Sequence, residues 1–186
     1  MKRLWFGKLV RVALIALAVT LGSARTLRAD EPSREYQVKA AFVYNFALFT
    51  EWPDRAFADK DSPFVIAVIG TDPFGQFLQQ TLQNKTVAGR PVILRHLDSA
   101  DQISGCQLLF VPATEDDHLD DIFKQVADQP ILTIGESDKF LDAGGIIRFL
   151  IEDGKIRFEI NPDAAAKAGL RISSKLLSLA KIYQKQ

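Results

Sequence analysis

The sequence predicts an α/β protein with a largely parallel sheet, covered by helices on both faces, and a C-terminal β-hairpin. Between residues 64 and 135, short apolar runs alternate with segments of helical periodicity, a pattern typical of parallel α/β folds. The runs FVIAVIG, CQLLFVP and ILTIG are nearly all apolar, as expected for strands covered on both faces. Further along, two alternating runs flank Asp153-Gly154, a pair typical of a two-residue hairpin turn.

Residues 1–29 have the layout of a secretory signal peptide. They hold six basic side chains, no acidic one, an apolar run over residues 12–22 and then small residues. Cleavage after Ala24 and cleavage after Ala29 both stay open, and the second leaves Asp30 first. An uncleaved membrane anchor is the alternative, but a run of 11 residues is shorter than the about 20 that span a bilayer. We expect Sec-dependent export to the periplasm, with residues 30–186 as the mature domain.

The mature domain is acidic, although the whole chain has a formal net charge of zero. Residues 30–186 hold 17 basic and 23 acidic side chains. Without a basic stripe, such a domain is a poor nucleic-acid binder, because that affinity rests on neutralised phosphates.

The stretch VKAAFVYNFALFTEWP, residues 38–53, predicts an aromatic helix that ends before Pro53. At helical spacing its apolar face comprises Val38, Phe42, Asn45, Phe46 and Phe49, extended sideways by Ala41, Leu48 and Trp52. Lys39 and Thr50 then form a narrow polar strip. We expect this helix to cover the sheet.

The elements that follow alternate in type. The apolar runs predict strands over residues 64–70, 91–97, 106–112 and 131–135, and helical patterns cover residues 74–84 and 116–127. The acidic pairs in the second helical pattern are typical of a helix face that is exposed to solvent.

The Asp153-Gly154 turn fixes the register of the hairpin. It pairs Ile147 with Ile160, Phe149 with Phe158, and Ile151 with Ile156 on one face, and Arg148 with Glu159, Leu150 with Arg157, and Glu152 with Lys155 on the other. We expect the apolar face to lie on the core and the charged face to be solvated or to contact a partner.

The last segment predicts two helices. Asn161 is a favourable N-cap with Pro162 in the first turn, and Gly169 ends this helix. Ser173 can cap a second helix, in which Ile172, Leu176, Leu179 and Tyr183 share a face.

Residues with catalytic potential are few, and we predict no cofactor, no metal and no enzymatic activity. His96 and His118 are the two histidines, and neither lies near a nucleophile motif. Cys106 is the one cysteine of the mature domain, so the domain cannot form an internal disulfide. Because Cys106 begins an apolar strand, we expect its thiol to be buried and inert.

A doubly wound sheet often offers a ligand crevice beyond the carboxyl ends of its strands. The polar residues at that edge are candidates for holding a small ligand: Thr71, Asp72, Thr114, Glu115, Glu136 and Ser137. Ordinary loop residues give the same pattern, so a small-molecule sensor and a hydrolase stay open as alternatives.

Four segments in the same order resemble the YfiR-like family of periplasmic proteins. They are VKAAFVYNFALFTEWP, CQLLFVP, ILTIGESDKFLDAGGIIRFLIEDGKIRFEIN and AAAKAGLRISSKLLSLAKI, and the resemblance covers residues 36–183. It implies a non-catalytic repressor that binds the periplasmic domain of an inner-membrane diguanylate cyclase (YfiN-like) until an outer-membrane lipoprotein (YfiB-like) draws it away. The well-known repressor has disulfides, which this chain cannot form internally.

A partner surface requires apolar side chains that the core does not already bury. The candidates are Trp52, Leu170, Ile172, Leu176, Leu179 and Tyr183. The oligomeric state stays open, with a homodimer among the options.

Overall fold

A computed structural model describes residues 31–184. Of these, residues 35–184 belong to one compact unit. The predicted signal peptide and both cleavage sites lie outside the described residues. Among the helices that are described, none is long and apolar enough to cross a bilayer.

The described helices and strands are short apart from the first helix. The helices are α2 (Glu31–Leu48), α3 (Gln76–Leu82), α4 (Leu119–Val126), α5 (Pro162–Lys167) and α6 (Ser174–Leu177), with 3-10 turns η1 (Asp54–Ala56), η2 (Ala100–Gln102) and η3 (Ala113–His118). The strands are β1 (Thr50–Glu51), β2 (Phe64–Ile69), β3 (Thr86–Val87), β4 (Arg90–Leu97), β5 (Leu108–Val111), β6 (Leu132–Gly135), β7 (Ile147–Glu152), β8 (Lys155–Ile160), β9 (Arg171–Ile172) and β10 (Lys181–Ile182).

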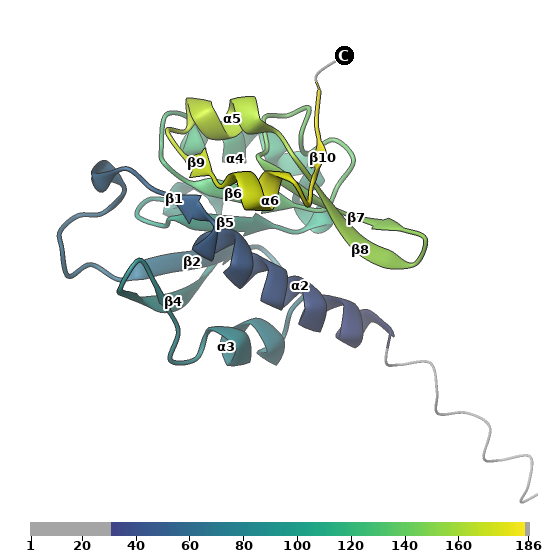
Figure 1. The fold of residues 1–186 in the computed structure, drawn as a ribbon, viewed down its shortest axis with the longest axis horizontal. Coiled ribbons are helices and arrows are strands. Elements are labelled where there is room, and N and C mark those ends of the chain that lie inside the picture. The colour runs from purple at the N-terminus through teal and green to yellow at the C-terminus, as the bar shows by residue number, and fades with distance from the viewer. Residues whose placement is uncertain (1–30, 185–186) are drawn as a thin grey trace, which may run out of the picture. The chain divides into compact units, whose positions relative to one another are not determined.

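Eight strands form one sheet in the order β10-β8-β7-β6-β5-β2-β4-β3 (Figure 1). The five neighbours from β4 to β7 are parallel, whereas β8 is antiparallel to β7 and β3 to β4. A separate pair, β1 and β9, is antiparallel. The predicted α/β class, with a largely parallel sheet and a C-terminal hairpin, is confirmed.

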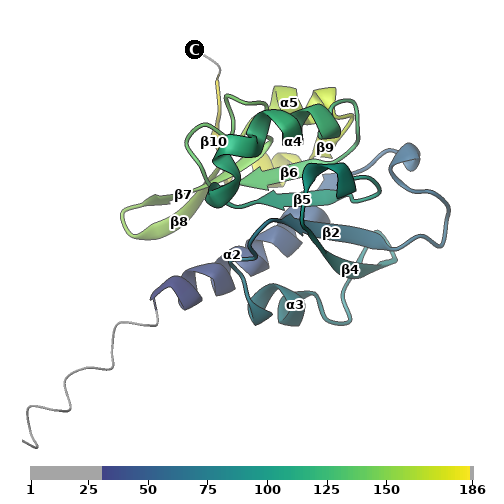
Figure 2. The same ribbon diagram turned by 180° about the vertical axis from the view of Figure 1, so that it is seen from behind.

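Both faces of the central strands are covered, as their composition predicts. Alternate residues of β2 belong to two clusters: Phe64, Ile66 and Val68 pack with α2 and α3, and Val65, Ala67 and Ile69 pack with α4. Helix α2 lies on the side facing the viewer in Figure 1, and α4 on the side facing the viewer in Figure 2. The predicted helix over residues 116–127 is divided into η3 and α4.

Helix α2 packs on the sheet through a different face from the predicted one. Its buried residues are Lys39, Ala40, Val43, Phe46 and Ala47, whereas Val38, Ala41, Asn45 and Leu48 are exposed. The predicted polar strip was therefore wrong, since Lys39 is only 5% exposed and Thr50 is also buried. Burial of Lys39 is possible because Glu35 and Glu136 neutralise its charge.

The hairpin has the predicted register in all six residue pairs. Asp153 and Gly154 have φ of 52° and 69°, the positive angles that a type I′ turn requires. Near the sheet, Phe149 and Phe158 are buried, but Ile151 near the turn is 60% exposed. The hairpin thus extends beyond the sheet, as Figure 1 shows.

The two rings of the hairpin join two rings of α2 in an aromatic cluster. The Phe46 ring lies 4.9 Å from Phe158 and 5.5 Å from Phe149, and the Phe42 ring lies 5.6 Å from Phe158. The aromatic surface of α2 therefore holds the base of the hairpin.

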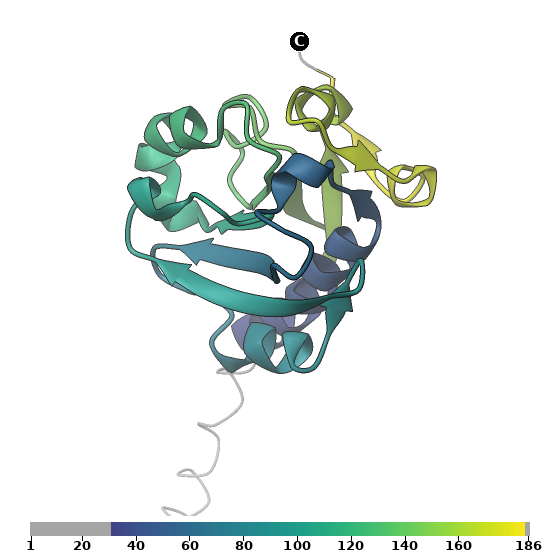
Figure 3. The same cartoon turned by 90° about the vertical axis from the view of Figure 1, so that its left-hand side faces the viewer.

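In the C-terminal segment the structure has both predicted N-caps, but the second predicted helix is shorter than expected. Asn161 Oδ1 accepts a hydrogen bond from the Ala164 N–H at 3.0 Å, and Ser173 Oγ from the Leu176 N–H at 3.3 Å. The second helix, α6, makes only one turn, so the predicted helical face shared by Ile172, Leu176, Leu179 and Tyr183 was wrong. Ile172 instead pairs with Thr50, and Tyr183 N–H bonds to Ile160 C=O. Figure 3 shows this segment (yellow) along one flank of the unit.

Candidate functional site

The order of the strands creates a switch point at the carboxyl ends of β2 and β5. The chain passes from β2 to β4 on one side and then returns to β5 on the other. Thr71 and Asp72 follow β2, and Thr114 and Glu115 follow β5. Gly70 has φ of +69°, and a Cβ there would overlap the Glu115 carboxylate. The Glu115 side chain therefore lies tightly against the end of β2.

Two histidine–carboxylate pairs occupy this edge. His96 Nε2 lies 2.8 Å from Asp72 Oδ2, and His118 Nδ1 lies 3.0 Å from Glu115 Oε2. Asp72 also accepts a hydrogen bond from the Phe74 N–H at 2.7 Å. A hollow of about 250 Å³ here is lined by Glu115 and His118. Within residues 31–184, no group of three or more His, Cys, Asp or Glu side chains could hold a metal ion.

Glu136 and Ser137 follow β6, and Glu136 binds helix α2. Its carboxylate accepts bonds from the Lys39 ammonium and, at 3.2 Å, from the Tyr36 hydroxyl. Burial and the Glu136 charge raise the pKa of Tyr36, so its hydroxyl stays a neutral donor. Ser137 Oγ is buried without a hydrogen-bond partner in the described residues. Glu136 thus joins α2 to the sheet, whereas Glu115 lines a hollow together with His118.

The six candidates for the partner surface differ in exposure. Leu170 and Leu176 belong to the core. The Trp52 ring is half-buried, packs edge-on against Phe64 at 4.8 Å, and donates a hydrogen bond to Gln107 C=O at 3.1 Å. Ile172 and Tyr183 are half-buried. Leu179 is 69% exposed, which leaves it as the most accessible of the six.

Leu179 belongs to an exposed group that we call the C-terminal patch: Lys175, Leu179, Lys181 and Ile182. Ile182 is 43% exposed, and both lysines are exposed. Residues 164–186 contain five basic and no acidic side chains, whereas residues 30–163 contain 12 basic and 23 acidic ones. The net charge of residues 30–186 taken together conceals this asymmetry. The four residues of the patch are thus exposed and apolar or basic, and Lys181 and Ile182 also line a shallow hollow with Asp138, Asp142 and Glu159.

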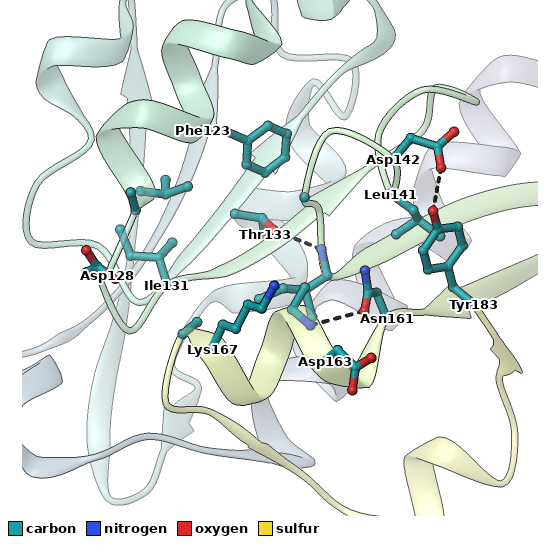
Figure 4. A pocket seen from close by; sticks show the side chains of 16 residues that line it. Phe123, Asp128, Ile131, Thr133, Leu141, Asp142, Asn161, Asp163, Lys167 and Tyr183 are labelled. Atoms are coloured by element: carbon teal, nitrogen blue, oxygen red, sulfur yellow. Dashed lines mark hydrogen bonds between the residues drawn. The ribbon is translucent and has the colours of Figure 1, made fainter. Parts of the chain in front are cut away.

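A larger hollow of about 380 Å³ lies at the other end of the sheet, where β6 begins and β8 ends (Figure 4). Its walls come from α4, the start of β6, the loop before β7, α5 and Tyr183. The Tyr183 hydroxyl donates a hydrogen bond to Asp142, which closes one end. Sequence reasoning missed this hollow, because the five parts of the chain that line it meet only in the fold and lie away from the carboxyl edge of the sheet.

Cys106 is buried in the cluster on the α4 face. Desolvation raises the pKa of its thiol to about 12, so the thiolate that reacts with electrophiles is scarce near neutral pH.

We expect Cys106 to react slowly with a maleimide at pH 7 in the native protein and rapidly after unfolding in urea. Mass spectrometry of timed samples measures both rates. Equal rates in the two states would contradict the buried position of the thiol.

Residues 36–181 match the protein family described as YfiR/HmsC-like. The chain belongs to the YfiR/HmsC-like family. The resemblance inferred from four sequence segments is thereby confirmed. YfiR/HmsC-like proteins are periplasmic regulators in cyclic-di-GMP signalling, a family of regulators and not of catalysts. In this YfiR/HmsC-like chain the matched residues run from α2 to Lys181, so they include Lys175 and Leu179 of the C-terminal patch.

Proposed function

We propose that the protein is exported to the periplasm, binds the periplasmic domain of an inner-membrane diguanylate cyclase and represses cyclic-di-GMP synthesis. The observation that carries this proposal is the YfiR/HmsC-like match over residues 36–181. The signal-peptide pattern of residues 1–29 supports export. By the same resemblance, an outer-membrane lipoprotein relieves repression by drawing the protein away from the cyclase.

We assign the contact with the cyclase to the C-terminal patch. Protein interfaces combine an apolar centre with a polar rim, and the exposed Leu179 and Ile182 are close in sequence to the exposed Lys175 and Lys181. The basic charge of this segment favours an acidic surface on the partner and steers the encounter. A complex of usual size buries about 1,200–2,000 Å², so neighbouring residues of β9 and α6 also contribute.

Deletion of the gene should raise cyclic-di-GMP and biofilm formation. The double variant Leu179→Glu/Ile182→Glu should do the same while it folds normally, because buried glutamates without partners oppose complex formation and exposed ones cost the free protein little. Cellular cyclic-di-GMP, measured by mass spectrometry, and co-purification of the cyclase with the exported protein test both expectations.

The matched control is Ile93→Glu on β4, near the opposite edge of the sheet. Ile93 is as exposed as Ile182, and edge strands tolerate charged side chains. This variant should repress like the wild type. An unchanged cyclic-di-GMP level after deletion would refute the repressor function. Full repression by the double variant would refute only the assigned surface.

A further inference from the structure

The 380 Å³ hollow of Figure 4 has the dimensions and lining of a small-ligand site. Ligand pockets commonly measure about 300–1,000 Å³ and combine apolar walls with a few convergent polar groups. Phe123, Ile131, Leu141 and Ile146 supply apolar lining from three different segments. The volume is at the lower end of this range, which suits a small molecule better than a nucleotide or a peptide.

Lys167 lines this hollow with an exposed side chain. Asp163 precedes it by four residues on α5, the spacing at which helical ion pairs usually form. No carboxylate of the described residues lies within ion-pair distance of Lys167, however. In Figure 4 the Lys167 ammonium group points toward the centre of the view, below Thr133, and the Asp163 carboxylate points the opposite way. Lys167 is thus an exposed cation of the lining that makes no ion pair within the described residues, although Asp128, Asp142 and Asp163 line the same hollow.

Asn161 places a second donor beside the hollow. Its Oδ1 accepts the capping bond from the Ala164 N–H, which fixes the orientation of the amide. The amide nitrogen makes no hydrogen bond within the described part of the chain, and it points away from α5 in Figure 4. An ammonium and an amide N–H group facing the same space are suited to a carboxylate.

Three acidic side chains surround the opening. Asp128, Asp142 and Asp163 lie at the periphery in Figure 4, and all three are exposed. Their charges repel ligands that carry several negative charges, such as phosphates. A single carboxylate next to Lys167 is tolerated, because the contact is short and the peripheral charges are screened by solvent.

From this geometry we infer that the hollow between α4, β6 and α5 binds a small monocarboxylate with an apolar or aromatic body. Lys167 and Asn161 hold the carboxylate, and Phe123, Ile131 and Leu141 contact the body. The inference goes beyond the proposed function and does not depend on it, since it concerns a different surface from the C-terminal patch.

Titration of the purified protein, expressed from the full-length gene, tests the inference. The probe is phenylpropionate, and phenylpropionamide and phenylpropylamine are its neutral and cationic counterparts. We expect saturable binding of phenylpropionate by calorimetry, at least about tenfold tighter than that of the amide, since one charge-assisted contact is lost. Amide NMR shifts should map to Gly144, Ala164 and their neighbours.

Two variants remove the donors and preserve the fold. Lys167→Met keeps the apolar stem, and Asn161→Asp keeps a good N-cap while it replaces the amide donor by a carboxylate. Each should weaken phenylpropionate binding at least about tenfold without lowering the melting temperature. The matched control, Lys124→Met, removes an exposed lysine of α4 and should bind like the wild type.

Three results would overturn the inference. One is the absence of saturable phenylpropionate binding at millimolar concentration. Another is equal or tighter binding of the amide or the amine. The last is wild-type affinity in both the Lys167→Met and the Asn161→Asp variants.

Discussion

Phe158→Ala should lower the free energy of unfolding by ~3–5 kcal/mol. The Phe158 ring is 6% exposed and contacts the rings of Phe42 and Phe46 on α2. Alanine leaves a cavity between the hairpin and the helix and removes the aromatic contacts. A domain of ordinary stability has about 5–15 kcal/mol, so the variant approaches the limit of folding. Urea denaturation followed by circular dichroism measures the change.

Ile151→Ala is the matched control for this prediction. Ile151 lies on the same face of the hairpin, but it is mostly exposed near the turn. Its replacement should change the free energy of unfolding by about 0.5 kcal/mol or less. A loss below ~1 kcal/mol for Phe158→Ala would show that the hairpin does not pack on α2 in solution.

The sequence predicts the parts of the fold whose pattern is local. The strands β2, β5 and β6 follow from unbroken apolar runs, and the register of β7 and β8 follows from Asp153-Gly154. The strands β1, β9 and β10 have two residues each and form only because a partner strand lies beside them. No periodicity encodes such pairing, which is why a single helix was predicted where α6 turns into β10.

The candidate site was less predictable for the same reason. Composition indicates which residues are apolar, but not which of them the core has already buried: Leu176 is buried and Leu179, three residues later, is exposed. The direction of Lys167 is equally hidden, since its spacing from Asp163 predicts an ion pair that the structure lacks. The burial of Lys39 depends on Glu136, which is 97 residues away.

The contact between Lys39 and Glu136 joins the first helix to the sheet through buried charges. Their side chains are 6% and 10% exposed, and Glu35 adds a second carboxylate at 2.5 Å from the Lys39 ammonium. The ammonium also lies 4.6 Å from the centre of the Tyr36 ring. A buried ammonium group of this kind is stable only next to a carboxylate, because burial of a charge without a counter-charge is costly.

Glu136→Gln should therefore lower the free energy of unfolding by about 3 kcal/mol. This value is at the lower end of the cost of breaking a buried ion pair, because Glu35 still pairs with Lys39 in the variant. Glutamine keeps the shape and an oxygen acceptor for Tyr36, so the variant removes the charge alone. The double variant Lys39→Met/Glu136→Gln should recover most of this loss, since the deeply buried ammonium is gone and the remaining Glu35 carboxylate is 27% exposed and reaches solvent. Asp121→Asn, which breaks the exposed pair with Lys124, should cost less than about 1 kcal/mol and serves as the control. Urea denaturation of the wild type and the three variants measures these differences in the free energy of unfolding. If the double variant is less stable than Glu136→Gln alone, the charge of Lys39 is not the reason why the loss of Glu136 is costly.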